Sequence, residues 1–106
     1  MVYPLKTYSN ELSVEHLKTM LRIRMVEQRI ADKYYEQEIR CPTHLSIGQE
    51  CTPAILSSFL SKEDLAVSSH RSHAHYLAKG GSLKKMISEI YGKANGCAGG
   101  KGGSMH

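Results

Sequence analysis

The chain has 106 residues, enough for one small domain. Hydrophobic residues make up 41% of it and charged residues 23%, a balance that is typical of soluble globular chains and excludes full disorder. No apolar run approaches the roughly 20 residues that span a bilayer, and the net charge of +4 comes from interspersed basic and acidic residues, which disfavours a nucleic-acid partner.

Residues 1–12 are predicted to form an irregular lead-in. Ser13 is a suitable helix N-cap, and Glu15 follows it near the positive end of the helix dipole. From Val14 to about Gln37 there is no Gly or Pro, and Leu, Met, Glu, Lys and Arg are abundant. These features predict a long helix over residues 14–37.

The faces of this helix follow from a turn of about 100° per residue. One sector is charged and is expected to face solvent: Glu15, Lys18, Arg22, Arg29, Lys33 and Glu36. Two further sectors are largely apolar: Met20, Ile23, Val26, Ile30 and Tyr34, then Leu17, Leu21, Met25, Ala31 and Tyr35. A helix that is apolar around most of its girth must be covered on several sides, so we expect more chain or a partner subunit to pack against it.

The middle of the chain is predicted to alternate loops with short elements. Residues 39–48 form a loop or a short extended piece, because Pro42 disfavours helix at the residue before it. A second helix is predicted over residues 49–60, with Pro53 in or near its first turn. Residues 64–68 are a candidate short strand, and residues 70–81 a histidine-rich connector.

Near the end of the chain, Ser82 is predicted to cap a third helix over residues 83–91, which Gly92 ends. Five glycines then occur between Gly96 and Gly103, but neither the Walker loop nor the dinucleotide pattern fits, since Asn95 and Met105 stand where glycine is required. The segment is either a flexible loop or a loop that packs close to a cofactor.

The densest chemistry lies between Ser69 and Tyr76. His70, His73 and His75 suggest a metal site, but the cation of Arg71 stands among them, which disfavours zinc. Arg71 is a candidate for binding a phosphate, because its planar guanidinium pairs with oxyanions, or it is an ordinary surface residue. His44 is either structural or a hydrogen-bond donor to an anionic substrate.

The cysteines and the first residues bear on location. Cys41, Cys51 and Cys97 are odd in number and form no CxxC pair, which favours reduced thiols. The start of the chain has neither the pattern of a secretory signal nor that of a mitochondrial transit peptide. We therefore predict a cytoplasmic protein with no membrane partner.

Several motifs follow one another in a specific order. After the long helix come His44-Leu-Ser-Ile-Gly-Gln-Glu50, His70-Arg-Ser-His73, Ala78-Lys-Gly80, Tyr91-Gly-Lys, Gly96-Cys97 and Gly100-Lys-Gly-Gly-Ser-Met-His106. From about Ser13 onward, the chain resembles the N-terminal part of the alpha subunit of thiamine-diphosphate-dependent 2-oxo acid dehydrogenases. This family includes the pyruvate, branched-chain 2-oxo acid and acetoin dehydrogenase first components.

The resemblance implies an α/β fold of which residues 13–106 are a partial domain, the mostly helical N-terminal part of a thiamine-diphosphate-binding fold whose sheet is largely missing here. It implies the cofactors thiamine diphosphate and Mg²⁺, held in a heterotetramer with a beta subunit. The implied reaction is oxidative decarboxylation of a 2-oxo acid, with acyl transfer to a lipoyl-bearing acyltransferase component.

The resemblance also implies site residues. Arg71 falls on the arginine that holds the cofactor diphosphate, and His70 falls where many members have a tyrosine beside it, which leans toward an acetoin-type member. His44 falls on the histidine that faces the substrate, a catalytic role, and His73 matches a histidine with a supporting role. The stretch from Gly100 to His106 matches a loop that approaches the active site.

The departures from the family are as informative. The family's diphosphate and magnesium motif, Gly-Asp-Gly, does not occur in this chain, so no metal ligands are predicted here and the isolated chain is expected to be inactive. The chain ends inside a matched motif, which predicts a fragment or a split subunit. The alternatives are a non-catalytic helical module that binds a beta subunit or another partner, and a zinc module using His73 and His75.

Overall fold

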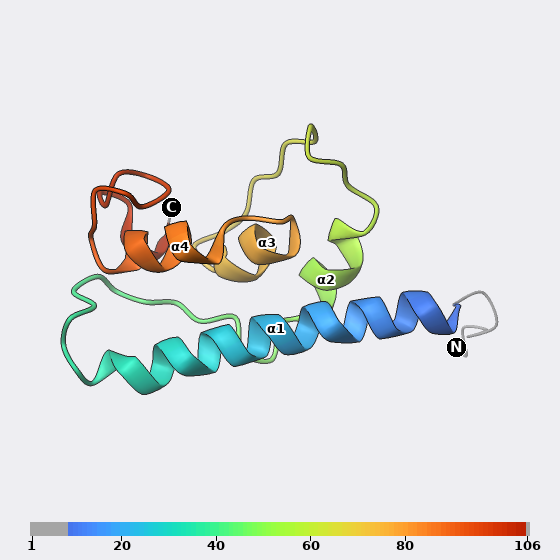
Figure 1. Cartoon of the computed structure of the whole chain (residues 1–106), viewed down its shortest axis with the longest axis horizontal. Helices are drawn as coiled ribbons and strands as arrows, with labels where there is room; N and C mark the ends of the chain where they lie inside the picture. Colours follow the sequence, from blue (N-terminus) through green and yellow to red (C-terminus); the bar gives the residue numbers. More distant parts are fainter. Residues whose placement is uncertain (1–8, 106) are drawn as a thin grey trace.

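The computed structural model of the chain describes residues 9–105, so most of the predicted lead-in, and His106, lie outside the described range. Within this range, four α-helices and one 3-10 helix follow in chain order: α1 (Asn10–Tyr34), α2 (Cys51–Ser57), α3 (His73–Ala78), α4 (Leu83–Ile90) and η2 (Gly103–Met105). Helix α1 runs the length of the molecule, and α2, α3 and α4 all lie on one side of it (Figure 1). The loop after α1 turns back along the helix toward α2.

The predicted long helix is confirmed, but its ends differ from the prediction. Ser9, not Ser13, is the N-cap, and its hydroxyl accepts a hydrogen bond of 3.1 Å from the Leu12 N–H. Ser13 lies one turn inside the helix and donates to the Ser9 carbonyl. Residues 10–12, predicted as lead-in, are therefore helical, because nothing between the two serines breaks a helix. Gln37 has a φ of +60° and lies beyond the C-terminal end.

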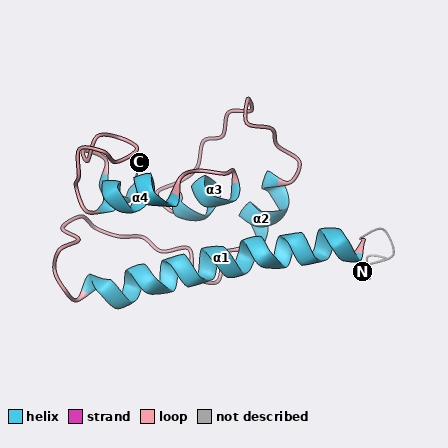
Figure 2. Cartoon of the chain, viewed as in Figure 1, coloured by secondary structure: helices cyan, strands magenta, loops and turns pink. Residues whose placement is uncertain are grey.

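The other elements confirm some predictions and correct others. Helix α2 is shorter than predicted, with Pro53 in its first turn, while Ser82 caps α4 as predicted and Gly92 follows it with a φ of +67°. Helix α3 was not predicted; it lies within the expected connector. No strand occurs in the described part of the chain, so the mostly helical character is confirmed and the α/β fold stays a prediction (Figure 2).

The strand prediction at residues 64–68 is wrong. Leu65 and Val67 are 97% and 100% exposed, and the segment lies in the long loop that arches away between α2 and α3. A strand needs a neighbour for its backbone N–H and C=O groups. Within residues 9–105 no neighbouring strand is available, so the apolar side chains of Leu65 and Val67 alone do not produce a strand here.

The core lies between the C-terminal half of α1, the loop that follows it, α3 and α4. Its buried apolar residues are Ile23, Ile30, Ile39, Ala74, Leu77, Met86 and Ile90. Burial of each large side chain contributes about 1.5–3 kcal/mol, so this cluster is the main source of stability in the described chain. The described helices include none that is long and apolar enough to cross a membrane.

One apolar stripe of α1 is left uncovered within the described chain. Leu17, Leu21 and Met25 are 54%, 51% and 69% exposed, and Val14 continues the stripe toward the N-terminus. The radius of gyration, 15.0 Å, exceeds the roughly 13 Å typical of a compact chain of this length. This stripe therefore has no packing partner within the described chain, and its coverage by more chain or by a partner subunit stays a prediction.

An ion pair fixes segment 44–50, the stretch that leads into α2, against α1. Arg24 Nε lies 2.5 Å from Glu50 Oε1 and its Nη2 lies 3.2 Å from Oε2, a bidentate pair. The Gly48 N–H also donates to Glu50. The Arg24 guanidinium, and then the Gly48 N–H, lower the pKa of Glu50 from 4.5 to about 2 despite its burial.

Because of this ion pair, we expect the free energy of unfolding to fall in acid. Because the pKa of Glu50 is lower in the folded chain, its contribution is complete above pH 4.5 and is lost as pH falls toward 2. We expect that contribution to be about 1–2 kcal/mol, less than the full pKa shift implies, since solvent screens the half-exposed Arg24. Urea unfolding at pH 7 and pH 2.5 measures it. Glu50→Gln should reduce this pH dependence, whereas the exposed control Glu63→Gln should not; equal curves for both variants would contradict the prediction.

Candidate active site

Three of the predicted site residues meet at the surface between segment 44–50 and the start of α3. The His44 and His70 rings lie edge to face, with centroids 4.6 Å apart. The Arg71 guanidinium donates through Nη1 to the Leu45 carbonyl, so it lies against the same segment. His70 and Arg71 are exposed and His44 is half-buried, which leaves all three open to a ligand.

Arg71 also lines a cleft of about 400 Å³ at the N-terminal end of α2. The cleft is bordered by Ser46, Gly48 and Gln49. The Ser46 hydroxyl is buried, 2% of the residue being exposed, and has no hydrogen-bond partner. A guanidinium with N–H donors beyond the one on Leu45, and a hydroxyl without a partner, are suitable donors for phosphate oxygens.

His73 lies apart from this surface, buried beneath it. Its Nδ1 is 2.9 and 3.0 Å from the two carboxylate oxygens of Glu27, and its Nε2 is 2.9 Å from Ser104 Oγ. Both ring nitrogens are therefore engaged in hydrogen bonds, and neither is free to bind zinc. Among residues 9–105, no three His, Cys, Asp or Glu side chains gather so as to hold a metal ion.

The glycine-rich segment is held by a carboxylate of its own chain. Glu89 of α4 is 1% exposed and accepts hydrogen bonds from the N–H groups of Ala98, Gly100, Gly102 and Gly103. Burial raises the pKa of Glu89, but these four N–H groups more than reverse this, so its pKa lies below the ordinary value. The N–H groups that a phosphate would need are thus already engaged, which corrects the expectation of a flexible, backbone-exposing loop.

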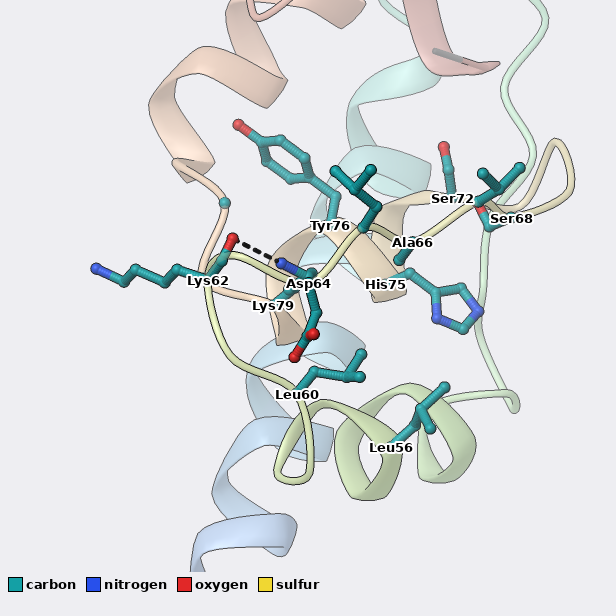
Figure 3. A pocket seen from close by; sticks show the side chains of 14 residues that line it. Leu56, Leu60, Lys62, Asp64, Ala66, Ser68, Ser72, His75, Tyr76 and Lys79 are labelled. Atoms are coloured by element: carbon teal, nitrogen blue, oxygen red, sulfur yellow. Dashed lines mark hydrogen bonds between the residues drawn. The ribbon is translucent and has the colours of Figure 1, made fainter.

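Two larger clefts lie elsewhere in the described chain. The largest, about 880 Å³, is lined by Leu56, Leu60 and Tyr76 beneath the long loop, and Figure 3 shows Lys79 donating to the Lys62 carbonyl at its edge. His75 is the one predicted histidine that lines it. A cleft of about 740 Å³ lies beside the glycine-rich segment. Arg71 lines only the smallest of the three clefts, and His44 and His70 line none of them.

Sequence reasoning missed Glu27, Ser46 and Glu89. A signal for Glu27 exists, because it lies on the buried face of α1 between Ile23 and Ile30, where an acidic residue requires a buried partner. Glu89 likewise sits beside the buried Ile90 of α4. No signal in the sequence marks Ser46, whose burial depends on the path of the loop.

Several known proteins are similar to this chain in sequence. Residues 18–106 match the family described as dehydrogenase E1 component. The chain is 40% identical over 93 residues to the pyruvate dehydrogenase E1 component subunit alpha of Rickettsia bellii, covering 88% of this chain and 28% of that protein. It is 38% identical over 98 residues to a chloroplastic E1 subunit alpha-3 of Arabidopsis thaliana, covering 92% and 23%, and 35% identical to a mitochondrial subunit alpha-1 of the same plant, covering 92% and 25%. The chain spans less than a third of the length of these relatives.

Proposed function

Because this chain belongs to the dehydrogenase E1 component family, we propose that it supplies the Arg71 side of a thiamine-diphosphate site in the alpha subunit of a 2-oxo acid dehydrogenase. One observation carries the proposal: the exposed Arg71 lies beside the His44–His70 pair and lines a cleft that is also lined by Ser46, whose hydroxyl has no hydrogen-bond partner. These residue types suit a diphosphate.

Each residue has a role that its position allows. Arg71 binds and neutralises phosphate oxygens, and the Leu45 carbonyl holds its guanidinium in place. His70 contributes an imidazole N–H beside it, in the place where relatives of this family often have tyrosine. His44 donates a hydrogen bond toward the 2-oxo acid or the charge that develops on it. Thiamine diphosphate, when bound beside Arg71 and His70, would supply the carbanion chemistry that these side chains lack.

The wider assignments follow from the family and are part of the proposal. The named relatives act as pyruvate dehydrogenases, which supports a 2-oxo acid over acetoin as substrate. A beta subunit would complete the site in a heterotetramer, and a lipoyl-bearing acyltransferase would accept the acyl group. No magnesium ligand is assigned to residues 9–105, and the isolated chain is not expected to turn over substrate. The cytoplasmic location stays a prediction, since relatives include chloroplastic and mitochondrial proteins.

A non-catalytic binding module is the second candidate. The exposed stripe of Leu17, Leu21 and Met25 on α1 supports it, because a partner helix would find an apolar face there. This candidate predicts that a partner subunit stabilises the chain with no dependence on thiamine diphosphate, and that Leu21→Lys removes the stabilisation.

The diphosphate role of Arg71 predicts a binding result. Isothermal titration of thiamine diphosphate with Mg²⁺ into the chain should show saturable binding, and Arg71→Ala should weaken it about tenfold or more, because a charge-assisted hydrogen bond is lost. Arg22→Ala, which removes an exposed positive charge from α1, is the matched control and should leave the affinity unchanged.

Two results would contradict the proposal. One is equal affinity of the Arg71→Ala and Arg22→Ala variants for the cofactor. That result would show that binding is only a general attraction between a basic chain and an anion. The other is the absence of binding at millimolar cofactor by a chain whose circular dichroism shows the helices in place.

A further inference from the structure

A buried relay of side chains joins three distant segments beneath the proposed site. Glu27 comes from α1, His73 from α3 and Ser104 from η2, and they are 0%, 2% and 2% exposed. The imidazole bridges the other two, with Nδ1 on the carboxylate and Nε2 on the hydroxyl. Burying polar side chains is costly, and the apolar core already packs α3 against α1. We therefore expect the buried relay to do more than hold these two helices together.

Both ends of the relay reach the backbone of segment 44–46. Ser104 Oγ accepts a hydrogen bond from the His44 N–H at 3.3 Å, and Glu27 Oε1 accepts one from the Ser46 N–H at 3.3 Å. Between them, the Leu45 carbonyl accepts from Arg71. Every residue of this three-residue segment therefore has a backbone group bound by a side chain from elsewhere in the fold.

The hydrogens in the relay can be assigned by following donors and acceptors. Because the Ser104 oxygen accepts from the His44 N–H, its own O–H is available to donate to His73 Nε2. His73 then donates from Nδ1–H to the carboxylate, which also accepts the Ser46 N–H. This direction satisfies every donor with one neutral tautomer of His73.

The order carboxylate, imidazole and hydroxyl is also that of a nucleophilic triad. Ser104 does not suit that role, since it is 2% exposed and its oxygen faces a backbone N–H instead of a cleft. None of the three clefts described above is lined by Ser104. The relay is thus better suited to holding a segment than to attacking a substrate.

We infer that Glu27, His73 and Ser104 are positioning residues that fix segment 44–46 and thereby place the His44 imidazole. The inference rests on the proposed function only for the role of His44; the clamp itself is a property of the folded chain. It also links the motif at residues 70–73 to the glycine-rich motif, which contains Ser104. Glu89 accepts hydrogen bonds from the N–H groups of Gly102 and Gly103 and so fixes the backbone just before Ser104. It assigns His73 a part in the site without contact with substrate or cofactor.

The first test needs no variant. Long-range ¹⁵N–¹H correlation NMR of the unliganded chain at neutral pH should show His73 as the Nδ1–H tautomer, with Nε2 as the unprotonated nitrogen. A His73 ring carrying its hydrogen on Nε2 alone would reverse the relay and overturn the inference.

The second test removes one link. Ser104→Ala should speed hydrogen exchange of the His44 amide about tenfold and shift the His44 ring resonances, because one hydrogen bond of the clamp is lost. Ser104→Thr keeps the hydroxyl and should restore both signals. The control Ser68→Ala removes an exposed hydroxyl that bonds only to its neighbouring carbonyl, and should change neither.

The outcomes separate the clamp from the proposed function. Unchanged His44 signals in a folded Ser104→Ala variant would overturn the clamp, whatever the titration of thiamine diphosphate shows. Changed His44 signals that Ser104→Thr restores would support it, even if the chain binds no cofactor. A uniform change across the core amides, with no larger effect at His44, would show a merely structural role and would also overturn it.

Discussion

Replacing Glu27 by alanine is expected to lower the free energy of unfolding by about 3–5 kcal/mol, because it breaks a buried polar pair and leaves its partners unpaired. The carboxylate is fully buried and accepts hydrogen bonds from both His73 and the Ser46 N–H. Alanine has no side-chain acceptor, so both buried donors lose their partner. Urea unfolding, followed by the helix signal in circular dichroism, measures the change in the free energy of unfolding.

Glu15→Ala is the matched control for this prediction. Glu15 lies on the same helix, and its side chain is 68% exposed in an ion pair with Lys18. An exposed pair of this kind contributes about 0–1 kcal/mol, so the control should be close to the unaltered chain. Equal effects at the two positions would mean that the relay around His73 does not stabilise the fold.

The second large effect is expected at Gly100. Its φ is +78°, and a Cβ added there would lie 2.7 Å from the Lys93 carbonyl oxygen, a backbone atom that cannot move aside. Gly100→Ala should therefore cost about 3 kcal/mol or more, combining left-handed strain with a steric clash. The loss of stability should be accompanied by faster exchange of the amides bound to Glu89.

Gly99 provides a control that isolates the clash. Its φ is +67°, but a Cβ there would meet nothing within 4 Å. Gly99→Ala should cost only the backbone strain, about 1–2 kcal/mol. If the two variants are equally stable, the glycine-rich loop does not pack on residues 92–93 as described.

Local signals were sufficient to predict the elements with strong signals of their own. The long helix follows from a stretch without Gly or Pro, and α4 follows from the cap at Ser82 and the stop at Gly92. The start of α1 was placed too late because Ser9 and Ser13 are equally good caps by residue type. Only the absence of a helix breaker between them favours the earlier one.

The errors arise where tertiary contacts decide the structure. Helix α3 has only six residues, too few for a periodic pattern, and it is stabilised by burial of Ala74 and Leu77. The strand expected at residues 64–68 would need a pairing partner, which the described residues do not provide. In both cases the structure of the segment depends more on its contacts with the rest of the fold than on its own local sequence.

The candidate site could be predicted in part. The family motifs identified His44, His70, Arg71 and His73, and the structure brings the first three together. It places His73 beneath them, hydrogen-bonded to Glu27 and Ser104, and its supporting role stays a prediction. The residues that hold this arrangement, Glu27 and Glu89, were not predicted, because an acidic residue in a helix is usually on the solvent side. The position of Glu27 between Ile23 and Ile30 on the apolar face is the sequence signal that was missed.

The most direct test of the account is to locate where the chain binds thiamine diphosphate. Two-dimensional ¹⁵N–¹H NMR of the labelled chain, titrated with thiamine diphosphate and Mg²⁺, reports this residue by residue. The account predicts the largest shifts at Ser46, His70 and Arg71 around the cleft, with His44 following. Shifts confined to the larger cleft at Leu56 and Tyr76, or to the glycine-rich loop with none at Arg71, would contradict it.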